Sequence, residues 1–424
     1  MNGFSSLRTF VALVAATALS PSTAAAKPPR RETPGPAPTH QPSEGKASGS
    51  TVDPALQKIA LRLLAETKSH EAAIVMSDVR TGRVLVWASR GQEDKDYVRE
   101  PFAPSASLFK VVTAAALLES GKVTPRTKQC WSGGERRIER EDLADDTATD
   151  DRCSTFGEAL GHSINLVFAR LALKHLTPDG LRDTAAELGI GSDVPIDVVV
   201  PRSPLRIKDD ELGFARSAAG FWNGHLSPLS ALFVMQTIAN RGERVRLHLR
   251  ADSPPVREEV GLALSTKTAD TLTRMLEVTT RDGTSAKVFG RSEHHAKFAF
   301  GRVAGKTGTL IGNHPRRMYS WFAGFAPSRK PEIAISVMLG NDVRWWKKAN
   351  EVGRELLEAY FAQQNGAGRP SKSDAPLPPK GLPRSLSLPF AGVGSEDDLG
   401  RSTWAVGRPW SRRRRPWCST GSHR

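Results

Sequence analysis

Cysteine is scarce in this sequence: the 424 residues include only three. Two of them, Cys130 and Cys153, flank a polar, charged segment, residues 131–152, whose composition predicts no hydrophobic core of its own. A bridge between them would restrict the loop entropy of that segment, so we expect a disulfide there, with two unpaired thiols as the alternative. Cys418 is left over, and the sequence leaves its state open.

Long apolar runs are also missing near the start of the chain. The run from Phe10 to Leu19 is short for a membrane span. It follows one basic residue, Arg8, and precedes small residues that end at Ala26, which is the layout of a secretory signal peptide. We therefore predict a signal peptide over residues 1–26, with an uncleaved anchor as the alternative. No cysteine offers a lipid anchor there, and we expect export into an oxidising compartment.

Acidic residues are outnumbered by basic ones, 45 against 60, which gives a net charge of +15 and a pI near 10.0. The excess predicts attraction to an acidic envelope polymer or reflects compositional bias, and part of it lies in Arg412–Arg415. No arginine–aromatic module for reading bases is present, so we expect no nucleic-acid partner. The adjacent His294 and His295 are too few for a metal site, and we expect no metal and no cofactor.

Proline, glycine and serine concentrate towards both ends, which predicts a flexible linker over residues 27–51 and a disordered tail over residues 366–424. Residues 52–365 form the expected folded domain. Its predicted elements are, in order, a helix from Pro54 capped by Asp53, strands at 72–77 and 84–88, a mainly helical middle to about residue 240, strands at 288–309, 318–325 and 333–339, and a helix at 350–364. Pairing the early hairpin with the late strands predicts an α/β (α+β) fold. It has a five-stranded antiparallel sheet flanked by helices, an all-helical second lobe, and a cleft between them.

Ser107 and Lys110 lie three residues apart at the start of a predicted helix, after the chain break at Pro104 and Ser105. That spacing puts a hydroxyl and an amine on one helix face, within hydrogen-bond reach. The amine can activate the hydroxyl only if it has lost its proton, which burial and a second nearby cation both favour. The alternative is a helix N-terminus with a solvated lysine.

Two further strings border the predicted cleft. Ser163 and Asn165 precede a helix, where both side chains can point into one cavity, or serve as a cap and a satisfied turn residue. Lys306, Thr307, Gly308 and Thr309 end a strand, with Lys306 as the second cation and Gly308 giving a ligand backbone room to approach. A phosphate-binding loop would need glycine at position 300, which is phenylalanine, so that alternative is disfavoured.

Taken together, the three strings resemble the ordered motifs of the penicillin-binding proteins and serine β-lactamases. The resemblance covers about residues 52–365 and implies a penicillin-binding transpeptidase domain of the β-lactamase/transpeptidase-like fold. Other stretches that look like this family are Leu226–Leu229, Ala239–Gly242, Arg281–Thr284 and Trp321–Pro327.

The resemblance implies acyl transfer at a D-alanyl-D-alanine peptide end of peptidoglycan, by a bacterial enzyme in the periplasm or on the outer face of the cytoplasmic membrane. Ser107 would be the nucleophile, Lys110 the base and Ser163 the proton relay. Lys306 completes the expected catalytic set and would engage the terminal carboxylate with Thr307 and Thr309. The expected substrate-binding set is Asn165, Thr307, Gly308 and Thr309, with the backbone N–H groups of Ser107 and Thr309 as oxyanion donors. Penicillins would acylate the same serine, so β-lactams are the expected inhibitors.

The sequence also departs from parts of this superfamily. No region of glycosyltransferase size precedes the domain, so we expect a bare catalytic unit on a tether, with the charged segment at 131–152 near the cleft rim. The Ser-x-Asn string argues against class D β-lactamases, and the deacylating glutamate string of class A is missing. The alternatives left open are a D,D-carboxypeptidase or β-lactamase that uses water, a non-catalytic penicillin sensor, and a wall-binding structural protein.

Overall fold

The computed structural model describes eight stretches of the chain: residues 49–91, 95–135, 137–221, 224–252, 257–290, 301–313, 315–342 and 346–367. The predicted signal peptide, most of the predicted linker, His294, His295, Phe300 and the tail with Cys418 lie outside these residues. Among the described residues, no helix has the length and apolar content needed to cross a membrane.

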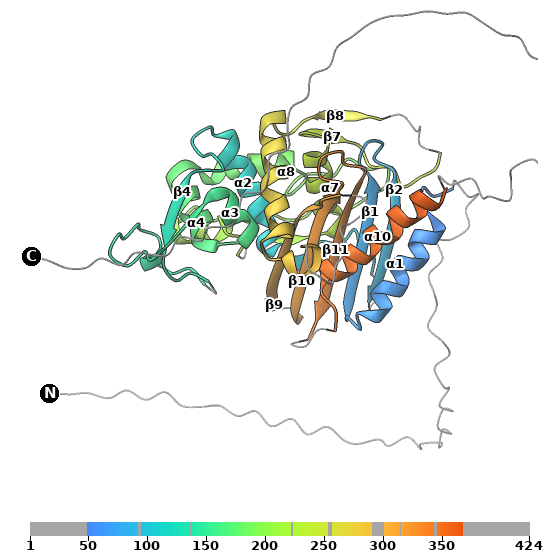
Figure 1. The fold of residues 1–424 in the computed structure, drawn as a ribbon, viewed down its shortest axis with the longest axis horizontal. Helices are drawn as coiled ribbons and strands as arrows, with labels where there is room; N and C mark the ends of the chain where they lie inside the picture. The colour runs from blue at the N-terminus through green and yellow to red at the C-terminus, as the bar shows by residue number, and fades with distance from the viewer. Residues whose placement is uncertain are drawn as a thin grey trace, which may run out of the picture. The chain divides into compact units, whose positions relative to one another are not determined.

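A five-stranded antiparallel sheet organises the fold, as predicted (Figure 1). Its strands are β1 (Glu71–Asp78), β2 (Val84–Gly91), β9 (Ala304–Asn313), β10 (Arg316–Ala326) and β11 (Ile333–Asn341), in the spatial order β2-β1-β11-β10-β9. The early strand β1 pairs with the late strand β11, with Ile74 opposite Val337. This pairing brings the two ends of the domain together and leaves β9 at an edge of the sheet.

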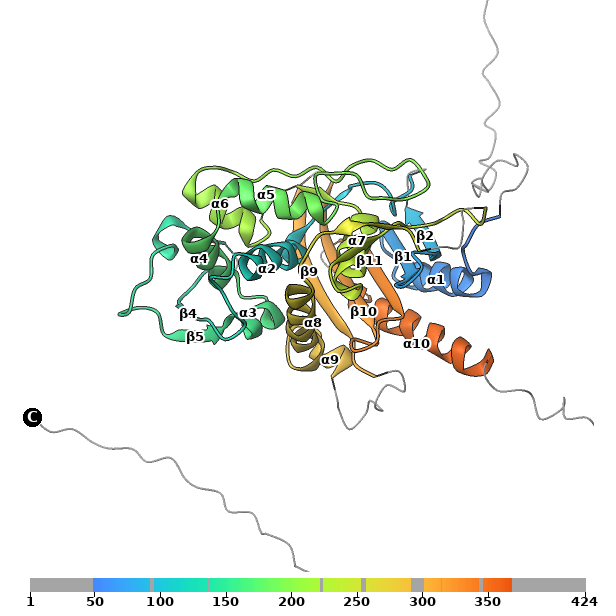
Figure 2. The same cartoon turned by 90° about the horizontal axis from the view of Figure 1, so that it is seen from above.

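Two helices, α1 (Pro54–Glu66) and α10 (Ala349–Ala367), cover one face of the sheet (Figure 2). Helix α1 begins where predicted, because the Asp53 carboxylate accepts hydrogen bonds from the N–H groups of Ala55 and Leu56 and proline fills the first helical position. Its apolar stripe, including Leu56 and Leu63, packs into a core shared with the sheet and with α10.

The opposite face carries α7 (Pro228–Ala239) and leads into a helical lobe. The lobe contains η1 (Ala106–Leu108), α2 (Phe109–Glu119), η2 (Arg140–Asp142), α3 (Phe156–His162), α4 (Asn165–His175), α5 (Pro178–Glu187) and α6 (Glu211–Ala218). Helix α8 (Thr266–Arg281) packs against both α3 and β9. One continuous core runs from Phe168 and Leu181 in the lobe to Trp321 in the sheet.

The predicted strand at 288–309 is wrong at its start. Residues Ala286–Phe289 form helix α9, and β9 begins at Ala304. The N–H groups of Val288 and Phe289 donate to the Ser285 carbonyl, and the Phe289 ring stacks on Phe322 with ring centroids 5.1 Å apart. An apolar, β-branched run therefore forms a helical turn because tertiary packing decides its conformation.

Several elements were not predicted from the sequence. They are α8 and the short strands β3 (Ala103–Pro104), β4 (Lys128–Trp131), β5 (Arg152–Thr155), β6 (His225–Leu226), β7 (Glu243–Val245) and β8 (Glu259–Leu262). The last residue of the predicted linker, Thr51, is part of the domain, because its buried hydroxyl donates to the carbonyls of Val84 and His248 at 2.7 and 2.8 Å.

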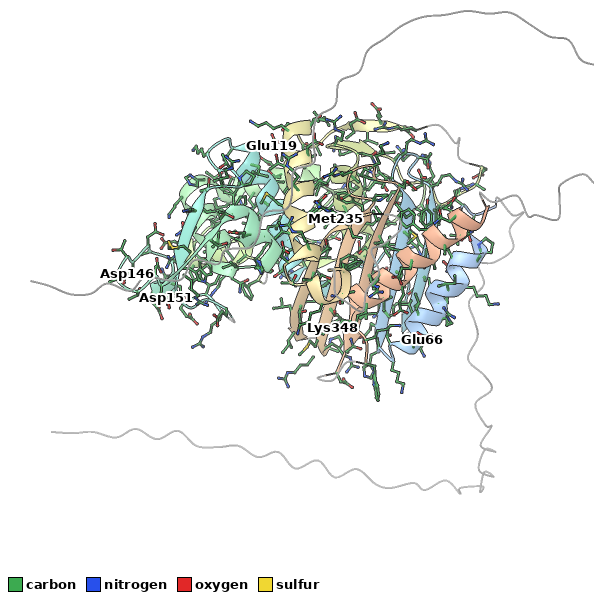
Figure 3. All side chains as sticks on the ribbon, viewed as in Figure 1. Glu66, Glu119, Asp146, Asp151, Met235 and Lys348 are labelled. Atoms are coloured by element: carbon green, nitrogen blue, oxygen red, sulfur yellow. A yellow bond between two sulfur atoms is a disulfide. The ribbon has the colours of Figure 1, made fainter. Side chains whose placement is uncertain are left out.

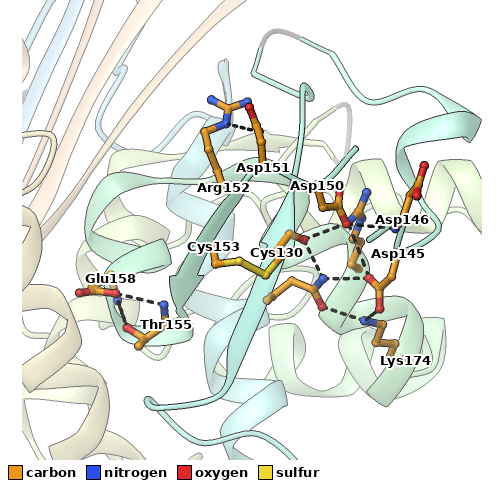
Figure 4. The surroundings of a disulfide bond; sticks show 12 residues. Cys130, Asp145, Asp146, Asp150, Asp151, Arg152, Cys153, Thr155, Glu158 and Lys174 are labelled. Atoms are coloured by element: carbon orange, nitrogen blue, oxygen red, sulfur yellow. Dashed lines mark hydrogen bonds and ion pairs between the residues drawn. A yellow bond between two sulfur atoms is a disulfide. The ribbon is translucent and has the colours of Figure 1, made fainter. Parts of the chain in front are cut away.

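Cys130 and Cys153 face each other on β4 and β5 and form the expected disulfide (Figure 4). The segment between them contributes to the main core through Trp131, Ile138 and Leu143. Its polar end extends away from the sheet, where Figure 3 labels Asp146 and Asp151.

Candidate active site

Ser107 lies in η1 and Lys110 in the first turn of α2, as their spacing predicts, with Lys110 Nζ 2.8 Å from Ser107 Oγ. The residue before the serine, Ala106, has a positive φ of 49°. Gly220, with φ 90°, packs against this turn so closely that a Cβ there would lie 2.2 Å from the Ala106 carbonyl oxygen. Only glycine meets both requirements at position 220, and its backbone holds the serine turn in place.

Lys110 is completely buried, and its Nζ lies 2.8 Å from Asn165 Oδ1 and 2.7 Å from the Ala219 carbonyl oxygen. Burial, and secondly the charge of Lys306, hold the pKa of Lys110 well below its ordinary value. A neutral amine has two N–H donors and one lone pair. Because Asn165 Oδ1 and the Ala219 carbonyl can only accept, they take the two donors, and the lone pair faces the Ser107 hydroxyl. This is the arrangement of a general base beside its nucleophile.

Lys306 is the second cation. It is also completely buried, with its Nζ 2.9 Å from Ser163 Oγ and 2.9 Å from the Thr307 carbonyl oxygen. Burial lowers the pKa of Lys306 to about 7.

Ser163 follows the last residue of α3 in the left-handed conformation, with φ 62° and ψ 40°. Left-handed backbone is uncommon for serine, and here it turns the chain between α3 and α4. Its side chain and that of Asn165 both reach one cavity, as predicted.

Asn165 makes contacts that the sequence did not reveal. Its Oδ1 accepts from Lys110, and its Nδ2 donates to the carbonyl oxygens of Gly134 at 3.1 Å and Glu135 at 2.8 Å. The amide therefore orients the base and holds the loop that follows β4. Its role in binding a substrate amide stays a prediction.

A cavity of about 760 Å³ lies along β9 and the helical lobe. Of the predicted residues, Ser107, Ser163, Asn165, Thr307, Gly308 and Thr309 line it, and Lys110 and Lys306 lie buried beneath it. The lining also includes residues that were given no site role from the sequence, namely Glu135, Thr284, Lys348 and Asn350. The Arg281–Thr284 stretch had contributed only to the family resemblance. In the structure, Thr284 Oγ1 lies 2.5 Å from Thr307 Oγ1.

Gly308 also has a packing role that the sequence did not show. A Cβ at this position would lie 3.3 Å from the Cβ atoms of Ala106 and Trp321, and 3.5 Å from the Leu108 nitrogen. The missing side chain therefore lets β9 approach the serine turn, and its use in making room for a ligand stays a prediction.

The site brings together a serine hydroxyl, a buried lysine in contact with it and a second buried lysine, beside an edge strand of the antiparallel sheet. Such an arrangement suits a serine enzyme that works by acyl transfer. Among the described residues, no group of three or more His, Cys, Asp or Glu side chains is placed to hold a metal ion.

Comparison with known proteins identifies the family. The model of the penicillin binding protein transpeptidase domain matches residues 72–358, more than half of the chain. The chain therefore belongs to the penicillin-binding protein transpeptidase domain family.

Curated relatives and solved structures agree. The chain is 29% identical over 266 residues to the peptidoglycan D,D-transpeptidase PbpA of Mycolicibacterium smegmatis (56% of this chain, 49% of the relative). It is 24% identical over 342 residues to the stage V sporulation protein D of Bacillus subtilis (71% and 50%). It thus spans about half the length of these relatives.

Two solved structures share the fold. One is the transpeptidase domain of penicillin-binding protein 3 from Burkholderia pseudomallei (TM-score 0.63, 20% identity, 78% of this chain and 99% of that one). The other is a penicillin G acyl-enzyme complex of penicillin-binding protein A from M. tuberculosis (0.57, 22%, 74% and 80%).

Proposed function

We propose that this chain is a peptidoglycan D,D-transpeptidase that forms an acyl-enzyme on Ser107 and that penicillins acylate at the same oxygen. The observation that carries the proposal is the Ser107–Lys110 contact, in which a buried amine with a lowered pKa faces the hydroxyl at 2.8 Å. The names of the relatives, which include peptidoglycan D,D-transpeptidases, supply the substrate class.

In the proposed reaction, Lys110 takes the Ser107 proton as Oγ attacks the penultimate D-alanyl carbonyl. The backbone N–H groups of Ser107 and Thr309 stabilise the negative charge on the carbonyl oxygen. Ser163, held by Lys306, passes a proton to the leaving D-alanine nitrogen as the peptide bond breaks, and takes up the proton held by Lys110, which becomes neutral again. An acceptor amine then attacks the ester, loses a proton to the base, and releases the peptide while Ser107 regains its hydrogen.

The substrate carboxylate is proposed to bind at Thr307 and Thr309 above Lys306. A negative group there would raise the pKa of Lys306 from about 7 and keep the lysine charged, which suits an electrostatic anchor. We propose export and action on peptidoglycan stem peptides outside the cytoplasm, in the setting of cell-wall synthesis that the relatives' names indicate.

The test is intact-protein mass spectrometry of the full chain with excess benzylpenicillin. We expect a stable single adduct in the wild type and in Ser120→Ala, a control at the exposed end of α2, and none in Ser107→Ala. Consumption of the drug without an adduct would instead indicate a β-lactamase. An intact drug without an adduct would contradict the proposal and favour a non-catalytic or structural role.

A further inference from the structure

One wall of the cleft is the segment closed by the disulfide, residues 131–152, which we call the wall loop. Side chains of the lobe hold its backbone carbonyls. Asn165 donates to Gly134 and Glu135, and Arg216 donates to Ile138 at 2.8 Å. Arg170 donates to Asp142 at 2.8 Å and to the adjoining Cys130 at 2.9 Å.

Arg170 is the strongest of these anchors. Its side chain is only 3% exposed and pairs at 2.5 Å with Asp150, whose side chain is 5% exposed. Breaking a buried ion pair leaves an uncompensated charge, so this pair resists movement of the loop. The wall loop is thus held in a defined position beside the cleft, which is what a recognition surface needs.

Glu135 is the residue that the wall loop presents to the cleft. Glu135 lines the same cavity as Ser107. Its backbone carbonyl accepts a hydrogen bond from Asn165, whose side chain also contacts Lys110. Among the residues lining that cavity it is the one with an acidic side chain. Its carboxylate pairs at 2.6 Å with Arg152, which lies over the Trp131 ring.

The lysines beneath the cleft indicate a function for the Glu135 carboxylate. Lys110 and Lys306 are buried below the cavity, so any positive charge on Lys306 repels an approaching cation. An amine acceptor is an ammonium ion at neutral pH before it reaches the site. A carboxylate on the wall offsets the repulsion and concentrates ammonium ions beside the acyl-enzyme.

We infer that Glu135 binds the ammonium group of the acceptor and so selects amines over neutral acceptors. The inference rests on the proposed transpeptidase function. The bound ammonium loses one proton to solvent before it attacks the ester, and the remaining steps are those given above. Arg152 competes for the same carboxylate, so the acceptor must share or displace that partner.

The competition between Arg152 and the acceptor distinguishes acceptor binding by Glu135 from a purely structural role of the Glu135–Arg152 ion pair. If Glu135 binds the acceptor, removing its charge weakens acceptor binding, whereas removing Arg152 takes away a competing cation and strengthens acceptor binding. If the ion pair only supports the wall loop, both substitutions weaken binding alike.

The experiment measures the acceptor KM for transfer from a D-alanyl thioester donor to D-alaninamide, a cationic amine, and to methanol, a neutral acceptor. We expect Glu135→Gln to raise the KM for D-alaninamide about tenfold, without a matching change for methanol. Arg152→Gln should lower the KM for D-alaninamide severalfold. The control is Glu141→Gln, an exposed glutamate of the same loop that does not line the cavity.

An unchanged KM in Glu135→Gln overturns the inference, as does an equal rise in Glu135→Gln and Arg152→Gln. Benzylpenicillin acylation, followed in parallel, tells this failure from a failure of the proposed function. If the wild-type chain is acylated and transfers the acyl group normally, only the inference about Glu135 is overturned. A wild-type chain that is not acylated overturns both.

Discussion

At the scale of single residues, the site depends on two lysines that are both buried yet have different partners. Lys110 faces Ser107, and Lys306 faces Ser163. The proposed roles predict that Lys110→Ala and Lys306→Ala each slow acylation by benzylpenicillin by about 10²- to 10⁴-fold, because each removes a group that moves or positions a proton. Adduct formation followed over time by mass spectrometry measures this. The exposed Lys122→Ala is the control, and near-normal acylation in both buried variants would refute the roles.

A second prediction concerns pH. The pKa of Lys306 is about 7 in the folded protein and about 10.5 in the unfolded chain. Between these values the unfolded chain binds a proton that the native protein lacks, so this group makes stability rise with pH through that window, by about 5 kcal/mol in total.

The variant Lys306→Met lacks this contribution. Its free energy of unfolding should therefore exceed that of the wild type most at and below pH 7, and the difference should shrink by about 2 to 3 kcal/mol between pH 7 and pH 9. Urea unfolding at the two pH values measures it. Parallel pH dependence of the two proteins would show that Lys306 titrates normally.

At this scale the sequence indicated the neighbouring contacts and the second lysine, Lys306, but not the backbone groups that the site side chains contact. The Ser107–Lys110 approach follows from helical spacing alone. By contrast, the acceptor that takes a Lys110 hydrogen is the backbone carbonyl of Ala219, and a carbonyl carries no sequence signal. Glu135 was expected only as part of a charged loop near the rim, because the sequence does not show which residue of that loop faces the cavity.

At the scale of elements, the serine turn is pressed between β9 and the backbone at Gly220. Gly220→Ala would place a Cβ 2.2 Å from the Ala106 carbonyl oxygen, so the turn must shift, and we expect acylation to slow by at least tenfold with a loss of stability of about 2 to 3 kcal/mol.

The matched control is Gly121→Ala. Gly121 also has a positive φ, 69°, but a Cβ added there would have no heavy atom within 4 Å, so only backbone strain of about 1 kcal/mol is expected, with normal acylation. Thermal unfolding and the acylation rate measure both variants. Equal effects in the two would show that the contact with Ala106 has no importance.

The predicted elements differ in how far local pattern decided them. Helix α1 was placed correctly because a cap, a proline and an apolar stripe agree. Helix α8 was missed. Thr266–Arg281 is rich in threonine and charge, but Ser265 caps its start and its buried apolar residues, Ala269, Leu272, Met275 and Leu276, recur at helical spacing, so the local signal was present in the sequence.

At the scale of the whole domain, the lobe and the sheet share one core, so we expect them to unfold together. Leu181 is fully buried in α5, and Leu181→Ala should cost about 2 to 5 kcal/mol. Native-state hydrogen exchange should show protection falling by the same amount in α5 and in β11. Leu61→Ala, at a position 43% exposed on α1, is the control with a small effect. A loss confined to α5 would mean that the lobe opens alone.

The sequence by itself determined the local parts of this protein: the helix caps, the early hairpin, the serine–lysine spacing and the motif order from which the family was inferred. These depend on residues a few positions apart, whose geometry is set by the backbone. The tertiary structure alone decided that the Ala219 carbonyl accepts from Lys110, that Asn165 holds the wall loop, and that Glu135 lines the cleft. Such contacts join segments far apart in the chain, and they exist because β1 pairs with β11 and one core packs the sheet against the lobe.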